Sequence, residues 1–269
     1  MPEATVARTV SDAADQLAAA GCDTPRLDAE LLVAEALGVA REQLVLEGDR
    51  PVDPEVVEGL IARRVAREPI AYILGRKPFR RITLAVDRRV LIPRPETELL
   101  VEVGLELQNS ARVVDVGTGS GAVALALKAE RPDLEVWGVD LSADALEVAR
   151  SNAASLGLDV AFVCDDLLEG VPEGVDAVLA NLPYVAVGSE LQPEIERYEP
   201  PGALLAGADG LTVIRRLVAQ AAGVPLLALE VAFDQADVVA ELLQGAGFAS
   251  IDRLRDLGGH ERVLIGRSR

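Results

Sequence analysis

The chain has 269 residues, half of them hydrophobic and only 3 % aromatic, so it can bury a sizeable core built mainly from Val, Leu and Ala. Its formal net charge of −18 argues against a broad electrostatic attraction to nucleic acid phosphates. With one histidine and two cysteines, Cys22 and Cys164, far apart in the sequence, we expect neither a metal site nor a histidine-dependent triad.

The location of the protein is expected to be cytoplasmic. The cysteine usage suits a reducing compartment. No apolar stretch approaches the length of a membrane span, and the first five residues lack the basic start of a secretory signal peptide. We therefore expect no membrane association.

Residues 1–76 are expected to form a helical domain. Gly or Pro separates three segments whose apolar residues recur at helical spacing. The residues expected to face inward are Val6, Val10, Ala14 and Leu17; Leu27, Leu31, Ala34 and Leu37; and Val57, Leu60, Ile61 and Val65. Since such a bundle carries no evident chemistry, we interpret it as a scaffold or a substrate-docking domain.

A cluster of basic residues lies near the end of this segment. Two interpretations are open: a local basic patch, or a solvated helix face followed by a loop. The residues concerned are Arg63, Arg64, Arg67, Arg76, Lys77, Arg80 and Arg81.

Around Phe79 the periodicity changes from helical to alternating. Residues 82–86 alternate apolar and smaller or polar side chains, 87–89 predict a turn, and 90–92 are apolar again. The pattern predicts a β-hairpin that connects the two halves within residues 77–94. The prolines and acids of 93–98 then favour a helix start, with Leu99, Leu100, Val103 and Leu107 as the buried stripe.

From Arg112 onward, strands and helices alternate to the end of the chain. We expect strands at 112–116, 134–140, 159–163, 175–180, 225–231, 249–255 and 261–266. Helices are expected at 120–130, 142–156, 210–222 and 234–245. The alternation predicts an α/β domain over residues 95–269 with a mostly parallel, doubly wound sheet.

A glycine-rich turn falls where the first strand of this domain ends and a helix begins. Glycines let the backbone approach a ligand closely, and free N–H groups at a helix start attract negative charge. Asp140 ends the next strand, where a carboxylate can accept hydrogen bonds from both ribose hydroxyls. The expected cofactor-binding residues are Asp115, Gly117, Thr118, Gly119, Ser120, Gly121 and Asp140.

Other interpretations of the turn are open. Gly117, Gly119 and Ala122 also match the G-x-G-x-x-A form of the dinucleotide fingerprint, and a tight turn without a ligand is possible. Asp115 favours S-adenosylmethionine, because a carboxylate would repel a pyrophosphate but can help to hold a cationic amino acid. Asp165 and Asp166, which end the third strand, are either contacts to the adenine edge or ordinary loop acids.

Asn181-Leu182-Pro183-Tyr184 follows the strand expected at 175–180 and predicts methyl transfer to an amide or amine nitrogen. The lone pair of an amide nitrogen is delocalised, as the rotation barrier of about 18–20 kcal/mol shows. The Asn181 side-chain oxygen and the Leu182 carbonyl can each accept one N–H and aim the lone pair. Pro183 stiffens the turn, and the Tyr184 ring can pack on the planar acceptor. These four residues also suit an ordinary strand end.

These residues resemble those of the peptide chain release factor glutamine N5-methyltransferases over nearly the whole chain. The resemblance also rests on 68–75, 91–98, Asp115–Gly121, Glu199-Pro200 with Ala203-Leu204, and Asp209-Gly210-Leu211. It implies a Rossmann-like S-adenosylmethionine-dependent methyltransferase sheet behind a small N-terminal helical bundle. The implied reaction methylates the glutamine of the Gly-Gly-Gln motif in class I release factors, which modulates translation termination.

The same resemblance implies residue roles. Gly117 to Gly121, Asp140, Asp166 and Asn181 would bind the donor, Asn181 to Tyr184 would bind the glutamine, and the helical domain would help to grip the release factor. The family pattern is Asn-Pro-Pro-Tyr, and Leu182 stands in place of its first proline. The carbonyl survives but the fixed φ angle is lost, so we expect a reduced rate with unchanged specificity. Near Asp166 the family often has an aromatic residue.

Two rival functions are considered. A nucleic-acid adenine N6-methyltransferase shares the acceptor motif, but the acidity of the chain and the lack of a separate basic domain weigh against it. We expect no direct nucleic acid binding. A non-catalytic S-adenosylmethionine-binding docking protein is the other rival, and Leu182 is its only support.

Overall fold

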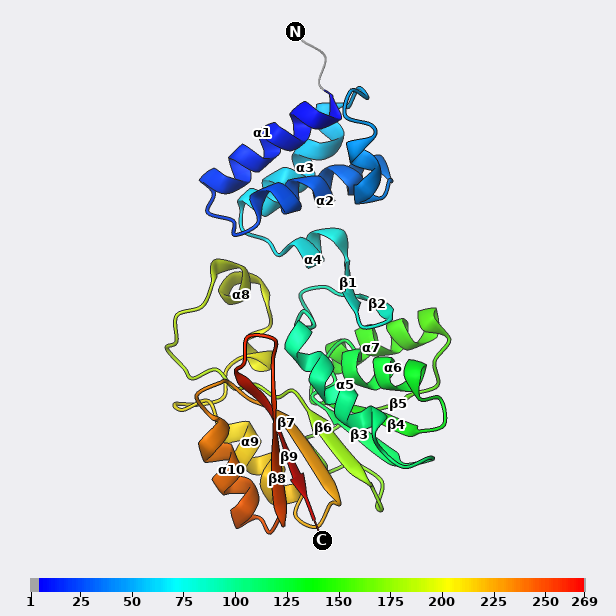
Figure 1. The fold of residues 1–269 in the computed structure, drawn as a ribbon, viewed down its shortest axis with the longest axis vertical. Coiled ribbons are helices and arrows are strands. Elements are labelled where there is room, and N and C mark those ends of the chain that lie inside the picture. Colours follow the sequence, from blue (N-terminus) through cyan, green and yellow to red (C-terminus); the bar gives the residue numbers. More distant parts are fainter. Residues whose placement is uncertain (1–4, 269) are drawn as a thin grey trace. The chain divides into compact units, whose positions relative to one another are not determined.

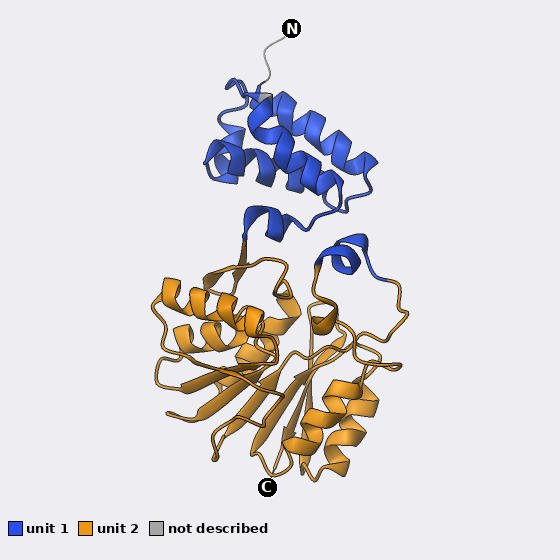
Figure 2. Cartoon of the chain, turned by 180° about the vertical axis from the view of Figure 1, so that it is seen from behind, with its two compact units in different colours: residues 1–75, 191–198 blue, residues 76–190, 199–269 orange. Residues whose placement is uncertain are grey.

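The computed structural model describes residues 5–268 (Figure 1). Residues 1–4 and residue 269 lie outside the described part. Residues 1–4 make up most of the N-terminal segment that we expected not to be a signal peptide. The chain divides into two compact units (Figure 2): residues up to 75 with 191–198, and residues 76–190 with 199–269. The expected boundaries at 76 and 94 did not anticipate that 191–198 joins the helical unit.

The helical unit consists of α1 (Val6–Ala19), α2 (Pro25–Leu37), a 3₁₀ helix (Arg41–Val45), α3 (Pro54–Val65), α4 (Ile70–Leu74) and α8 (Pro193–Tyr198). The buried face of α1 is close to the expected one. The face expected for α2 is only partly right: Ala34 is buried, but Leu27 is 40 % exposed, and Leu32 and Val33, which were not expected, are fully buried. Asp28 also turns inward, where Arg64 donates to it at 2.7 Å, so the buried side of α2 carries this ion pair beside Leu32 and Val33.

Part of the basic cluster is neither a free patch nor a solvated helix face, although Arg63, Arg76 and Arg81 are exposed. Arg64 is buried and donates to Asp28 and Glu194, and Arg67 donates to the same Glu194. Arg63 pairs with Glu68, and Arg80 of the second unit pairs with Glu130, in both cases at two guanidinium nitrogens. Four of the seven cations, Arg63, Arg64, Arg67 and Arg80, thus pair with carboxylates within the protein.

The β-hairpin lies earlier in the chain than expected. It pairs β1 (Arg76–Phe79) with β2 (Ile82–Ala85) in antiparallel register. The second strand expected at 90–92 is absent; these residues form an irregular segment. Ile92 is buried, but its N–H donates to the Glu199 carboxylate at 3.2 Å instead of to a strand.

The second unit is built on a seven-stranded sheet in the order β5-β4-β3-β6-β7-β9-β8. Its strands are β3 (Arg112–Val116), β4 (Glu135–Asp140), β5 (Ala161–Cys164), β6 (Ala177–Ala180), β7 (Leu226–Glu230), β8 (Ser250–Arg255) and β9 (Glu261–Arg267). β9 runs antiparallel to both neighbours, and the remaining pairs are parallel. The expected mostly parallel, doubly wound sheet is confirmed.

Helices cover both faces of this sheet (Figure 1). One face carries α5 (Glu98–Leu105), α6 (Ala122–Glu130) and α7 (Ala143–Leu156), and the other carries α9 (Thr212–Gln220) and α10 (Ala236–Gly245). Two short 3₁₀ helices, Pro95–Thr97 and Pro201–Ala203, precede α5 and α9. Strand and helix centres are packed mainly with Val, Leu, Ile and Ala, as the composition predicts.

The register of the parallel strands decides where the site lies. Val116 is paired with Val139 on one side and Ala180 on the other, and Ala180 is paired with Leu229. The residues that follow these positions therefore emerge at one edge of the sheet, where ligands bind in open α/β folds. Among the described helices, none combines the length and apolarity that a membrane crossing needs.

Candidate active site

A cavity of about 380 Å³ opens at the carboxyl ends of β3, β4 and β6. It brings together most of the positions that the sequence singled out, although they come from four separate strand ends and loops. The expected site residues that line it are Gly117, Gly119, Asp140, Asp165, Asp166, Asn181, Leu182 and Pro183.

The glycine-rich turn packs directly against the Asn181–Tyr184 motif. Gly117 and Gly119 have φ angles of +73° and +54°, which only glycine adopts without strain. A β-carbon on Gly117 would lie 3.1 Å from the Leu182 side chain, whereas one on Gly119 would meet nothing closer than 4.0 Å. A side chain at Gly117 would therefore crowd the contact between the two motifs, whereas Gly119 leaves open space beside the cavity.

Asp140 is held by backbone donors from two segments. Its Oδ2 accepts from Gly119 N and its Oδ1 accepts from Ser142 N, both at 2.9 Å. Burial raises the pKa of Asp140, and these two N–H groups oppose that rise. A carboxylate offers about four acceptor positions, so capacity is left for hydroxyl donors in the cavity.

Asp115 supports the turn and does not line the cavity. Its Oδ2 accepts from Thr118 Oγ1 at 2.6 Å and from Ala124 N at 3.1 Å, which ties the end of β3 to the first turn of α6. Burial raises the pKa of Asp115 to about 7. Thr118, Ser120 and Gly121 are also absent from the lining.

The acidic pair after β5 lines the cavity but is engaged within the protein. Asp165 Oδ1 accepts from Asp166 N at 2.8 Å, and Asp166 Oδ2 accepts from Arg216 at 2.6 Å. Leu141, which the sequence analysis did not single out, also lines the cavity and is 72 % exposed. Its position directly after the strand-ending acid is the signal that could have identified it.

Asn181 is part of a short chain of hydrogen bonds behind the cavity. Its Nδ2 donates to Thr97 Oγ1 at 3.0 Å, and Thr97 Oγ1 donates to Glu230 Oε2 at 2.7 Å. The Tyr184 hydroxyl lies 3.4 Å from Glu230 Oε1. Neither Thr97 nor Glu230 was expected at the site. A single acid at the end of the otherwise apolar strand β7 is the signal that was missed.

Glu230 is enclosed by the protein. It is 2 % exposed, and burial raises its pKa to about 7 although Thr97 donates to it. Burial and the neighbouring Glu230 carboxylate together raise the pKa of Tyr184 to about 12. The Tyr184 phenol therefore keeps its proton near neutral pH and donates it in a hydrogen bond to Glu230.

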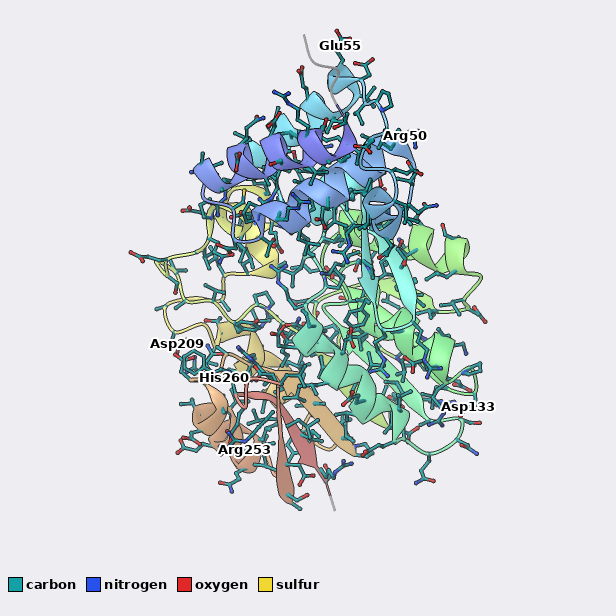
Figure 3. The ribbon with its side chains drawn as sticks, turned by 45° about the horizontal axis from the view of Figure 1, so that its top comes forward. Arg50, Glu55, Asp133, Asp209, Arg253 and His260 are labelled. Carbon is teal, nitrogen blue, oxygen red and sulfur yellow. The ribbon has the colours of Figure 1, made fainter. Side chains whose placement is uncertain are left out.

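Leu182 packs into the core beneath the turn. Its side chain is 4 % exposed and belongs to the same apolar cluster as Val116, Ala180 and Ile214. Tyr184 instead lines a second cavity of about 610 Å³, together with Asp209 and Gln235. Asp209 is exposed and lies on the loop before α9 (Figure 3).

Two further contacts fix the walls beside the motif. Gln235 Nε2 donates to the Tyr184 carbonyl at 2.9 Å, and a β-carbon on Gly210 would lie 2.2 Å from that oxygen. Buried Glu199 accepts from Arg94 at 2.5 Å and from Ile92 N, which holds the segment that contributes Leu91 to the cavity. Within residues 5–268, no group of His, Cys, Asp and Glu has the geometry of a metal site.

Two family models match parts of this chain. Residues 9–75 match the family model described as the PrmC N-terminal domain, and residues 95–197 match the methyltransferase small domain. Solved methyltransferases share the fold at low identity. The hMettl16 catalytic domain in complex with an RNA hairpin has a TM-score of 0.58 and 15 % identity, covering 78 % of this chain and 82 % of that one.

A second solved structure is the 16S rRNA N2 G1207 methyltransferase of T. thermophilus in complex with AdoMet and guanosine. Its TM-score is 0.52 at 19 % identity, covering 72 % of this chain and 50 % of that one. Both likenesses show the fold alone.

Curated relatives carry the name release factor glutamine methyltransferase. The protein of Rhodospirillum rubrum is 40 % identical, covering 97 % of this chain and 85 % of its own length. The Deinococcus radiodurans protein is 40 % identical over 96 % of both chains, and that of Mycolicibacterium smegmatis is 46 % identical over 80 % of this chain and 79 % of its own. The resemblance seen in the sequence is thereby confirmed: this chain belongs to the release factor glutamine methyltransferase family.

Proposed function

We propose that this chain transfers a methyl group from S-adenosylmethionine to the side-chain amide nitrogen of the glutamine in the Gly-Gly-Gln motif of class I release factors, and so modulates translation termination. The observation that carries the proposal is the position of Asn181. Asn181 lines the cavity together with Gly117 and Gly119, and its Nδ2 donates to Thr97 Oγ1. The amide oxygen is left for a substrate.

The residues of the cavity fit the methyl donor. Gly117 and Gly119 allow close approach of a ligand to the backbone, and Asp140 retains acceptor capacity for ribose hydroxyls. Leu141 offers an exposed apolar surface for a base, beside Asp165 and Asp166. When bound, S-adenosylmethionine would supply an electrophilic methyl group: its S–C bond breaks as the N–C bond forms, S-adenosylhomocysteine leaves, and the amide nitrogen releases one proton to water. Asp115 is proposed to shape the turn rather than to touch the donor.

The acceptor amide is handled by two oxygens of the motif. Asn181 Oδ1 and the Leu182 carbonyl each accept one N–H of the glutamine amide, which holds the nitrogen lone pair toward the donor. Both oxygens bind more strongly as positive charge grows on nitrogen, which is electrostatic stabilisation of the transition state. Fixing the two groups near contact can contribute up to about 7–11 kcal/mol.

Each remaining part has a proposed role. Pro183 keeps the turn rigid, and Tyr184, which lines the second cavity, supports the motif through the contact of its hydroxyl with Glu230. The helical unit is proposed to bind the release factor. This agrees with its interpretation from the sequence as a docking domain without catalytic residues. The expected place of action is the cytoplasm, where translation occurs.

The proposal is tested by incubating the chain with S-adenosylmethionine and an intact class I release factor, then measuring methylation of the Gly-Gly-Gln peptide by mass spectrometry. We expect an added methyl group on the glutamine, with a rate that falls at least about 100-fold in Asn181→Ala, the scale found when an oxyanion-hole donor is removed. In parallel reactions, DNA and RNA are expected to remain unmethylated. Methylation of nucleic acid with none on the release factor would assign the adenine N6 activity instead, and no methylation of any substrate would leave a binding protein.

A further inference from the structure

The orientation of the Asn181 side-chain amide is set by its hydrogen-bond partner, Thr97. The two ends of an amide differ chemically, because the oxygen accepts hydrogen bonds and the nitrogen donates them. For the proposed reaction the oxygen must face the substrate, since a glutamine amide nitrogen brings two N–H donors. A flipped Asn181 would present donor to donor.

Thr97 supplies the missing constraint. Its hydroxyl has one proton, which it donates to Glu230 Oε2 at 2.7 Å. Toward Asn181, 3.0 Å away, the same oxygen can then only accept, so the group that faces it must be Nδ2. When Glu230 is ionised, its carboxylate therefore sets the direction of the hydrogen bonds that run from Asn181 to Thr97 to Glu230.

The free oxygen of Asn181 is accessible. Among the described residues, no buried side-chain nitrogen or oxygen lacks a hydrogen-bond partner. Asn181 Oδ1 accepts no hydrogen bond from residues 5–268, so it is not fully buried, and Asn181 lines the cavity. The oxygen is thus left without a protein donor at a residue that lines the cavity.

We infer that Thr97 and Glu230 are positioning residues, which act through Asn181 by holding its oxygen toward the substrate amide. The inference rests on the proposed function and adds two residues to it. Both come from elements outside the motif: Thr97 ends the 3₁₀ helix before α5, and Glu230 ends β7. Neither touches the reacting atoms.

The test compares Thr97→Val with Thr97→Ser. Valine keeps the shape but removes the acceptor, and serine restores it. A misplaced catalytic group can cost about 100-fold, so we expect kcat for release factor to fall roughly 10- to 100-fold in Thr97→Val. The kcat of Thr97→Ser is expected to stay within about threefold of the parent value, because serine again supplies the hydroxyl. KM and the calorimetric affinity for S-adenosylhomocysteine should change little, which separates positioning from loss of folding. An equal kcat in parent and Thr97→Val would overturn the inference.

Two further measurements show whether Thr97 acts through Asn181. In the double variant Thr97→Val/Asn181→Ala, we expect no loss beyond that of Asn181→Ala alone, because residues acting as one unit are not additive. Full additivity would contradict the inference.

In the parent, exchange of the Asn181 side-chain amide protons, followed by ¹⁵N NMR, should be slow for the proton that Thr97 accepts. Fast exchange of both protons would refute the inference even if Thr97→Val does not fold. This readout needs no activity, so it separates failure of the inference from failure of the proposed function.

Discussion

Glu194 accepts two hydrogen bonds from the Arg67 guanidinium, from Nε to Oε1 and from Nη2 to Oε2, both at 2.6 Å. The same carboxylate accepts from Arg64 Nη1 at 2.8 Å. Both arginines belong to the N-terminal helical segment, whereas Glu194 follows the Asn181–Tyr184 motif in the chain. Charge pairing thus incorporates residues 191–198 into the helical unit.

Replacing Glu194 by alanine should destabilise the helical unit. Arg64 would keep its pair with Asp28 but lose one anion while it stays buried, and breaking a buried ion pair costs about 3–5 kcal/mol. Urea unfolding should show the loss, and hydrogen exchange should show faster exchange in 191–198. Glu196→Ala, an exposed neighbour in α8, is the control and should change stability by less than about 0.5 kcal/mol. Equal losses in both variants would contradict the role of the ion pairs.

The contribution of Glu194 should depend on pH. Burial alone would raise its pKa, but hydrogen bonds from Arg67 and Arg64 lower it to about 2, from an ordinary 4.5. A lowered folded pKa stabilises the protein above the unfolded pKa, and the contribution is lost as pH falls from about 4.5 to 2. The stability difference between parent and Glu194→Ala should therefore shrink below pH 4.5.

Asp140→Ala should weaken binding of the methyl donor. The change removes the proposed acceptors for ribose and the bond that holds Gly119 N. Hydrogen bonds to charged groups contribute about 1.5–3 kcal/mol, so we expect the calorimetric Kd to rise roughly 10- to 100-fold. Asp144→Ala, an exposed acid four residues later in α7, should leave the Kd unchanged. An unaltered Kd in Asp140→Ala would remove this residue from the donor site.

Gly210→Ala should disturb the acceptor motif from outside it. Gly210 has a φ angle of +73°, and a β-carbon there would meet the Tyr184 carbonyl at 2.2 Å. Since that atom is backbone, the motif itself must shift, and we expect kcat to fall about 100-fold. Gly245→Ala has open space at its β-carbon and should act as the neutral control. Normal kinetics in Gly210→Ala would show that the loop absorbs the methyl group.

Leu182→Pro tests the departure from the family pattern. Proline restores a fixed φ angle, so the rate on release factor should rise while specificity stays unchanged. The Leu182 side chain is buried, so its loss should also cost about 1–3 kcal/mol of stability. Steady-state kinetics and urea unfolding measure the two effects. A new substrate with no change in rate would contradict the expectation.

The rate should fall in acid as Glu230 becomes protonated. Burial raises its pKa to about 7; Glu96 adds to the rise, whereas Thr97, Arg262 and Tyr184 oppose it. A protonated Glu230 can donate to Thr97, which no longer fixes the Asn181 amide. We expect kcat to decline as pH falls below about 7 and the decline to disappear in Glu230→Gln, which does not titrate. An identical acid limb in both proteins would assign it to another group.

Much of the catalytic unit follows from sequence patterns. Strands of Val, Leu and Ala that end in Gly117, Asp140 and Asn181 predict a parallel sheet, and the carboxyl ends of parallel strands share one edge. Each expected strand and helix after residue 110 is present within a few residues. The hairpin was predicted too far along the chain because residues 90–92 are apolar. They are apolar because they are buried, with Ile92 N bonded to Glu199, and not because they form a strand.

What local patterns determined was the identity and order of the parts: a helical domain, a glycine-rich turn and an acceptor motif on successive strands. These depend on periodicity and turn chemistry, which act over a few residues. Only the tertiary structure decided which polar groups meet. Asp115 accepts a hydrogen bond from Thr118 and does not line the cavity. Residues 191–198 belong to the helical unit, and Thr97 links Asn181 to Glu230 by hydrogen bonds. A buried charge or amide needs a hydrogen-bond partner, because burial without one costs free energy. The fold supplies that partner from distant parts of the chain, so the spacing of residues in the sequence does not predict it.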